Sequence, residues 1–165
     1  MQHVQIRSTT SALVLTAVLI ALATLFTMYT KIPVPGIRGY FNVGDVVIMT
    51  SALLLGRKYG AYIGAIGPAL ADLFLGYAVF VPITFVVKGI EGYLVGTVYN
   101  HKTTTSALVA TIVGGIVIVA GYFIAEYFVF DPGVAIASIL TNAIQAVMSV
   151  IVSIILYAIL RKRLG

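Results

Sequence analysis

The stretch VFVPITFVVKGIEGYLVGTVYN, residues 79–100, reads as one apolar helix with a cation and an anion near its middle. A helix rises about 1.5 Å per residue, so this stretch is long enough to cross the roughly 30 Å hydrocarbon core of a bilayer. An isolated charge at the bilayer centre costs about 2.5–3.5 kcal/mol or more. Lys88 and Glu91 therefore indicate polar partners or a wet cavity inside a membrane domain.

The composition of the whole chain fits a membrane protein. Of its 165 residues, 61% are hydrophobic and only 9% are charged, whereas soluble domains carry about 25% charged residues. We therefore expect an all-α, polytopic membrane protein with six transmembrane helices in a single membrane domain, residues 1–165. The apolar runs place these helices at about residues 9–30, 45–56, 59–76, 81–100, 106–128 and 134–160.

The first two apolar runs have unusual lengths. The run at 9–30 exceeds the 7–15-residue apolar core of a signal peptide, so we expect it to be a membrane span. The run at 45–56 is too short to cross a bilayer unaided. Either the loop before it enters the membrane, or neighbouring helices shield it. Asp45, at the start of this run, is interpreted as a helix N-cap.

Basic residues predict the orientation of the spans. Six spans place both termini on one side of the membrane. That side carries seven basic residues and the opposite side two: Arg7, Arg57, Lys58, Lys102, Arg161, Lys162 and Arg163 against Lys31 and Arg38. Because cytoplasmic loops are enriched in Lys and Arg, we expect both termini in the cytoplasm and loops 31–44, 77–80 and 129–133 outside.

The charged residues inside the spans, and two amides of the last helix, lie in the outer half of the membrane or near its midplane. They are Asp72, Lys88, Glu91, Glu126, Asn142 and Gln145. On the last helix, Ser138, Asn142, Gln145, Ser149 and Ser153 recur every three or four residues and share one face. This pattern favours a cavity that opens outward and binds a solute.

A purely structural role is the alternative for each of these residues. Lys88 and Glu91, three residues apart, could neutralise each other. Asp72 could pair with Lys88, and Glu126 is close enough to the outer boundary to be solvated. The serines and amides of the last helix could form the interhelical hydrogen bonds that are common in membrane bundles.

Three motifs stand out between residues 32 and 96. They are NVGD at 42–45, GAYIGAIGPALAD at 60–72, where Pro68 replaces a small residue, and KGIEGYLVG at 88–96. Together they resemble the substrate-binding S components of energy-coupling factor (ECF) vitamin transporters of bacteria and archaea. The resemblance implies a six-helix bundle that binds its ligand near the outer surface, under loop 31–44 and among the last three helices. It also implies that the loaded S component rotates within the membrane to deliver its vitamin.

The same resemblance implies a partner complex, made of a transmembrane coupling subunit and two cytoplasmic ATPase subunits. Ala17 and Ala21 match the small-residue pattern with which the first helix of this family packs against the coupling subunit. The chain has no Walker motif, so we expect no enzyme activity and ATP hydrolysis in separate subunits. No cofactor is expected, and the sequence lacks the His, Cys or Met clusters of a metal site.

The candidate substrate-binding residues come from the spans and from the loops at their outer ends. They are Tyr40, Asn42, Asp72, Tyr77, Phe85, Lys88, Glu91, Tyr122, Glu126, Asn142 and Gln145. Three acids against one lysine disfavour a strongly anionic solute, and aromatic rings could stack on a flat one. A small neutral or weakly cationic vitamin is favoured, of the B6 (pyridoxine), hydroxymethylpyrimidine or thiamine type, with riboflavin and pantothenate as alternatives.

Other classes of protein fit less well. A self-sufficient secondary transporter is the alternative class, but such folds usually show inverted repeats with broken helices, and no clear repeat is visible. An intramembrane serine protease needs a histidine inside the spans, whereas His3 and His101 lie outside the apolar runs. The net charge of +5 reflects basic residues at helix ends rather than nucleic-acid binding. We expect a multi-pass protein of the prokaryotic plasma membrane.

Overall fold

A computed structural model describes residues 9–33, 40–99 and 103–164, which form six helices and one pair of short strands. In chain order, the elements are α1 (Thr9–Tyr29), β1 (Ile32–Pro33), β2 (Tyr40–Phe41), α2 (Asp45–Leu55), α3 (Arg57–Phe74), α4 (Phe80–Val98), α5 (Thr104–Val129) and α6 (Pro132–Leu164). The largest difference from the expected ranges is in α6, which continues beyond residue 160 through three basic residues. Hydropathy marks where the apolar run ends, whereas a helix can extend into the polar headgroup region.

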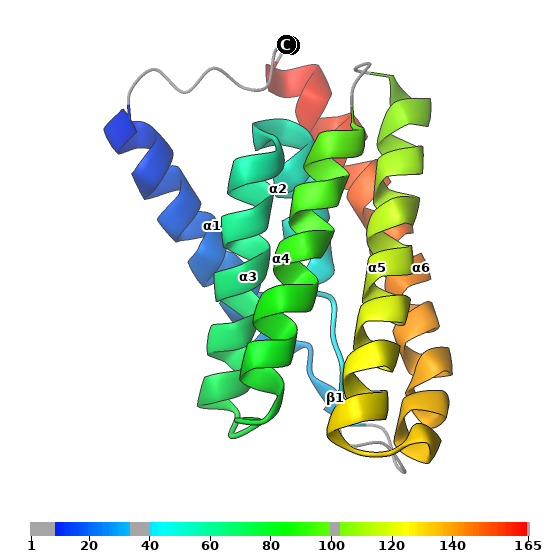
Figure 1. Cartoon of the computed structure of the whole chain (residues 1–165). Coiled ribbons are helices and arrows are strands. Elements are labelled where there is room, and N and C mark those ends of the chain that lie inside the picture. Colours follow the sequence, from blue (N-terminus) through cyan, green and yellow to red (C-terminus); the bar gives the residue numbers. More distant parts are fainter. Residues whose placement is uncertain (1–8, 34–39, 100–102, 165) are drawn as a thin grey trace.

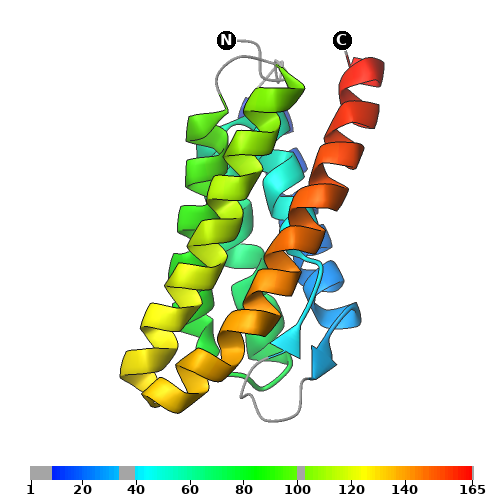
Figure 2. The same cartoon turned by 90° about the vertical axis from the view of Figure 1, so that its right-hand side faces the viewer.

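The helices lie side by side in a bundle whose two ends differ (Figures 1 and 2). The start of α1, the α2–α3 turn and the last turns of α6 lie at one end, here called the terminal end. Strands β1 and β2 lie at the opposite end, here called the hairpin end, with the α3–α4 and α5–α6 connections. The strands pair antiparallel, with Ile32 opposite Phe41 and Pro33 opposite Tyr40.

Helix α2 is shielded by its neighbours. Nine of its eleven residues are buried, and the helix packs against α3, α4 and α6. Gly56 turns the chain from α2 into α3 with a φ of 91°, which is a conformation that residues with a side chain rarely adopt. Of the two possibilities left open by the sequence, the structure supports shielding. Residues 34–39 of the preceding loop lie outside the described residues.

Among the described residues, four helices are long and apolar enough to cross a membrane: α1, α4, α5 and α6. Helix α2 is too short for this test. Helix α3 carries three charged residues, Arg57, Lys58 and Asp72, and an internal proline, Pro68. The structure thus has the long apolar helices that a multi-pass membrane protein requires.

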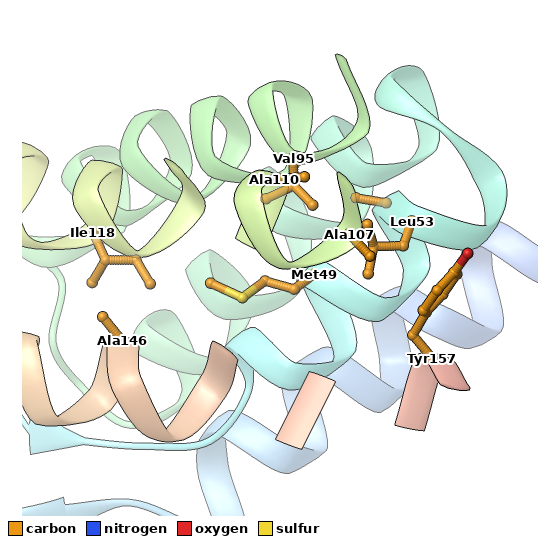
Figure 3. Packing of buried hydrophobic residues seen from close by; sticks show 9 residues of the cluster. Met49, Leu53, Val95, Ala107, Ala110, Ile118, Ala146 and Tyr157 are labelled. Atoms are coloured by element: carbon orange, nitrogen blue, oxygen red, sulfur yellow. The ribbon is translucent and has the colours of Figure 1, made fainter. Parts of the chain in front are cut away.

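An apolar cluster fills the bundle between its middle and the terminal end (Figure 3). It comprises Met49, Ala52 and Leu53 of α2, Val95 of α4, Ala107, Ala110 and Ile118 of α5, and Ala146 and Tyr157 of α6. Helix α4 runs from the hairpin end to the terminal end, so Val95 lies beyond Lys88 and Glu91. The apolar cluster, here called the apolar floor, therefore lies on the terminal-end side of Lys88 and Glu91.

Helices α3 and α4 pack so closely that glycine is required at their contact. A Cβ atom on Gly92 would collide with the backbone carbonyl of Gly60, and one on Gly64 would collide with the carbonyl of Lys88. The glycines noted in these helices thus serve internal packing, as small residues often do in membrane bundles.

The substitution Gly92→Ala is expected to lower the free energy of unfolding by about 1–3 kcal/mol, the usual cost of overpacking. The neighbouring backbone cannot move aside as a flexible side chain would. Gly89→Ala is the matched control on the same helix, because its nearest neighbour would be the side-chain Cβ of Ala65 at 3.1 Å. Thermal unfolding in detergent, followed by circular dichroism, measures both; equal melting temperatures would contradict this packing.

Candidate substrate-binding site

A cavity of about 40 Å³ lies toward the hairpin end of the bundle, enclosed by five helices and the segment that leads into α2. Two wall residues, Tyr40 of β2 and Asn42, lie before α2. The others come from the helices: Thr27 of α1; Pro68 and Asp72 of α3; Phe80, Thr84 and Lys88 of α4; Tyr122 and Glu126 of α5; and Ser138, Asn142 and Gln145 of α6. Eight of the eleven candidate residues named from the sequence are in this set, so the structure brings most of them to one place.

Helical periodicity turns these side chains toward the cavity. On α4, Phe80, Thr84 and Lys88 are four residues apart and share one face. The first half of the polar face of α6 lines the cavity in the same way. Further along this face, the hydroxyl of Ser153 donates to the backbone carbonyl of Val46 at 3.5 Å. That serine therefore has the interhelical role that was the alternative interpretation.

Lys88 has two carboxylate partners. Its Nζ lies 2.5 Å from Oδ1 of Asp45 on α2 and 3.4 Å from Oε2 of Glu91 on its own helix. None of the three residues is more than 1% exposed. The i,i+3 pair expected from the sequence is present, but the closer partner comes from α2. Among the described residues, Asp72 forms no ion pair with Lys88 and accepts a hydrogen bond from Tyr40.

Asp45 is not a helix cap, and the interpretation of it as one was wrong. Gly44 occupies the N-cap position, while Asp45 is the first residue of α2 and is fully buried. Its Oδ1 meets Lys88, and its Oδ2 accepts a hydrogen bond from Nε2 of Gln145 at 2.7 Å. A buried lysine is a stronger partner for a carboxylate than a free backbone N–H, which explains the outcome.

A chain of hydrogen bonds continues from Asp45 to the segment before α2. Oε1 of Gln145 accepts from the backbone N–H of Asn42 at 3.0 Å and from Nδ2 of Asn42 at 3.5 Å. Oδ1 of Asn42 in turn accepts from the backbone N–H of Gly44 at 2.9 Å. These partners fix the orientation of both amide side chains at the cavity wall.

Two further carboxylates line the walls and meet hydroxyl groups instead of cations. Tyr40 donates to Oδ1 of Asp72 at 2.6 Å, and Ser138 donates to Glu126. Burial and the adjacent Asp72 carboxylate raise the pKa of the Tyr40 phenol, which therefore stays a donor. Glu126 is only 4% exposed, so the possibility that it is solvated is wrong. Among the residues that the structure describes, neither acid forms an ion pair.

Aromatic rings close the hairpin end of the cavity. The ring centroids of Tyr40 and Tyr77 are 5.0 Å apart, those of Tyr77 and Phe80 are 6.4 Å apart, and those of Phe80 and Phe130 are 5.4 Å apart. Nζ of Lys31 lies 5.3 Å from the Tyr77 centroid. Tyr77, one of the candidates, thus packs against the ring of Tyr40 and does not line the cavity.

Two other candidates lie away from the cavity walls. Glu91 is buried one turn of α4 closer to the terminal end than Lys88, and neither of its oxygens has a hydrogen-bond partner among the described residues. Phe85 is 50% exposed, because it is about 100° around α4 from Thr84 and faces outward. This placement contradicts the expectation that Phe85 contacts a ligand in the cavity.

Sequence reasoning missed three polar residues at the site: Asp45, Thr27 and Thr84. The threonines gave no signal, because threonine in an apolar helix commonly bonds back to its own helix. Asp45 could have been found from a charge argument. A lysine buried in a membrane span needs an acidic partner, and Asp45 is the acid at the expected outer end of the apolar run 45–56.

Ala17 and Ala21 are exposed on α1, whereas Ala23 is buried against Gly67 of α3. The two alanines matched to a docking surface therefore do not serve packing inside this chain. Other residues named from the sequence lie outside the described part of the chain: Arg7, Arg38 and Lys102 of the charge pattern, and both histidines.

The fold has a solved counterpart. The crystal structure of the S component for biotin from an ECF-type ABC transporter matches with a TM-score of 0.60, covering 90% of this chain and 94% of that one at 19% sequence identity. The chain therefore has the fold of an ECF S component.

The sequence narrows this class to a family. Residues 7–162 match the model of the S component of the ECF-type riboflavin transporter, and the chain belongs to this family. The chain is similar to an uncharacterized protein of the gap 3′ region of Pyrococcus woesei, with 41% identity over 86% of this chain and 96% of that protein. It is also similar to the thiamine precursor transporter HmpT of Lactococcus lactis subsp. cremoris (strain MG1363), with 29% identity over 98% of this chain and 92% of HmpT.

These matches confirm the resemblance on which the sequence-based expectations depended. The chain is a multi-pass membrane transport protein, and its family consists of substrate-binding transporter components rather than enzymes.

Proposed function

We propose that the chain is the substrate-binding subunit of an ECF-type importer and that the cavity binds a small, weakly cationic heteroaromatic vitamin. A thiamine precursor of the hydroxymethylpyrimidine type is favoured, with thiamine and pyridoxine-type B6 next. The observation that carries this choice is the charge of the cavity wall. Asp72 and Glu126 are buried there without an ionic partner among the described residues, while Lys88 is already paired twice.

An aminopyrimidine matches this wall chemically. Its N–H groups and a protonated ring nitrogen would donate to the carboxylates, and charge-assisted hydrogen bonds are stronger than neutral ones. The rings of Phe80 and Tyr122 line the same cavity and offer apolar contact to a flat ring. The similarity to HmpT, whose name specifies a thiamine precursor, supports the same choice.

The cavity must widen to accept such a ligand. Its volume is about 40 Å³, whereas small-molecule sites usually measure about 300–1,000 Å³. Tyr40 and Asn42 belong to residues 40–44, the described segment that leads into α2, and contact the cavity through side-chain hydrogen bonds to Asp72 and Gln145. We propose that this segment moves outward when ligand enters and that Tyr40 gives up Asp72 to the ligand.

All six helices are proposed to form one membrane domain with both termini in the cytoplasm. Arg57 and Lys58, and the basic residues 161–163, lie at the terminal end of the bundle, which supports a cytoplasmic position for that end. The cavity then lies near the outer surface, beneath the aromatic rings, and the apolar floor formed by residues such as Met49 and Val95 lies on its cytoplasmic side. Among the described residues, no buried charged side chain lies on the cytoplasmic side of this floor, so the chain would capture a solute without conducting it inward.

Transport is therefore proposed to need partners: a transmembrane coupling subunit and two cytoplasmic ATPase subunits. The exposed alanines of α1, Ala17 and Ala21, are proposed to contact the coupling subunit. The loaded chain would rotate within the membrane to release its vitamin to the cytoplasm.

Riboflavin is the second candidate, because the matching family model describes a riboflavin transporter component. The isoalloxazine ring is flat and would use the same aromatic walls. It carries no positive charge, however, and would leave Asp72 and Glu126 without a cationic partner.

Isothermal titration calorimetry on the purified chain tests the substrate class. Hydroxymethylpyrimidine, thiamine and pyridoxine are expected to bind one to one and more tightly than riboflavin or pantothenate. Asp72→Asn and Glu126→Gln are each expected to weaken the binding by about tenfold, the loss of roughly one charge-assisted hydrogen bond. Tighter binding of riboflavin, unaffected by both variants, would reject the weakly cationic vitamin in favour of the second candidate.

A further inference from the structure

Asp45 does not line the cavity, yet it holds two residues that do. Its Oδ1 lies 2.5 Å from Nζ of Lys88 on α4, and its Oδ2 accepts a hydrogen bond from Nε2 of Gln145 on α6 at 2.7 Å. Asp45 itself is fully buried at the start of α2. One carboxylate therefore joins three helices at the base of the cavity.

This contact controls the positive charge that the cavity presents. Lys88 is the one cationic residue among the described residues of the cavity wall. Its charge faces Asp45 at 2.5 Å and Glu91 at 3.4 Å, so little of it is left for a ligand. Asp72 and Glu126 are the acidic residues of that wall, and neither forms an ion pair among the described residues.

We infer that Asp45 sets the charge selectivity of the cavity. By neutralising Lys88, it makes the site accept an unphosphorylated vitamin and reject the phosphate ester of the same vitamin. The inference rests on the proposed function, because it requires a vitamin in this cavity. Asp45 acts through Lys88 and Gln145 and is a positioning residue, not a ligand contact.

The physical cause is repulsion inside a buried site. A phosphate ester carries nearly two negative charges at neutral pH. Beside the buried carboxylates of Asp72 and Glu126, these charges repel strongly, because the dielectric constant is lower than in water. A lysine that has lost Asp45 and keeps only the longer contact with Glu91 would supply a counter-charge and N–H donors for phosphate oxygens. Lys88 is positioned to do so, since its side chain already lines the cavity.

Calorimetry on the purified full chain in lipid nanodiscs tests the inference with vitamin pairs. Hydroxymethylpyrimidine, thiamine, pyridoxine and riboflavin are each compared with their monophosphate. The wild-type chain is expected to bind the unphosphorylated member at least about 100-fold more tightly. Asp45→Asn preserves the shape of the side chain and is expected to reduce this ratio by at least about tenfold.

Two further variants separate charge selectivity from a general structural effect. The double variant Asp45→Asn/Lys88→Met is expected to reject the phosphate again, because the freed ammonium group is gone. Asp131→Asn makes the same chemical change in an exposed position and is expected to leave the ratio unchanged.

The outcomes are distinct. An unchanged ratio in Asp45→Asn, with binding retained, would overturn the inference, as would phosphate affinity that persists in the double variant. If Asp45→Asn does not fold, the wild-type chain decides, because equal affinity for both members of a pair overturns the inference without any variant. If only the riboflavin pair binds, the proposed substrate is wrong, but the ratio for that pair still tests Asp45. Binding of no pair contradicts both proposals.

Discussion

Replacing Lys88 by methionine is expected to lower the free energy of unfolding by about 3–5 kcal/mol, the usual cost of removing one partner from a buried ion pair. Lys88 is 1% exposed and is the cation for both Asp45 and Glu91, each fully buried. Methionine fills a similar volume, so the loss is mainly one of charge. Guanidinium or thermal unfolding in detergent, followed by circular dichroism, measures it.

Glu91→Gln is the matched control for this prediction. It removes the weaker partner, whose oxygens have no hydrogen bonds among the described residues, and leaves the contact of Lys88 with Asp45 in place. Its stability is expected to stay within about 1 kcal/mol of the wild-type value. If Lys88→Met were as stable as Glu91→Gln, the lysine would not be the charge that holds this cluster together. The pattern of the sequence favours ligand contact by both residues and so predicts that both variants weaken binding more than folding; the burial of Lys88 between two carboxylates adds a large effect on folding for that residue.

The second large effect is expected at the surface of α1. Ala21→Trp should abolish vitamin uptake in cells that contain a coupling subunit and ATPase subunits, because a bulky ring on an exposed small-residue face prevents close helix contact. The affinity of the purified chain for its vitamin should not change, since Ala21 is exposed and is not part of the cavity wall. Uptake of radiolabelled vitamin and calorimetry give the two readouts; Ala17→Trp should behave in the same way.

Two controls show whether the α1 surface itself matters. Ile116→Trp places the same ring on α5, where the side chain is 61% exposed, and uptake should continue. Ala23→Trp places it on the buried side of α1 against Gly67, and the chain should lose stability and binding together. Normal uptake by the Ala21→Trp variant, or lost binding in it, would contradict docking through this face.

Much of the fold follows from the sequence, because hydropathy and helical periodicity are local properties. Six apolar runs gave six helices, and the face shared by Ser138, Asn142 and Gln145 lies on the cavity as the spacing indicated. Helix ends were less predictable, as α6 shows. Whether α2 is shielded was not decidable, because a short apolar helix has the same sequence pattern in either setting.

The candidate site was harder to predict, because its contacts join residues far apart in the chain. The pair of Lys88 and Glu91 is local and was expected. Asp45 is 43 residues from Lys88 and 100 from Gln145, and no local pattern marks those contacts. Phe85 was misplaced for a different reason: aromatic content near a cavity mouth does not say which side of a helix a ring faces.

The central claim is that this cavity is where the vitamin binds, and intrinsic fluorescence tests it directly. The chain has no tryptophan, so Phe80→Trp adds a single reporter at the cavity wall and Phe85→Trp adds one on the outer face of the same helix. Titration with hydroxymethylpyrimidine should change the fluorescence of Phe80→Trp, with saturation at one equivalent, and leave that of Phe85→Trp unchanged. A saturable change in Phe85→Trp, with none in Phe80→Trp, would contradict the claim.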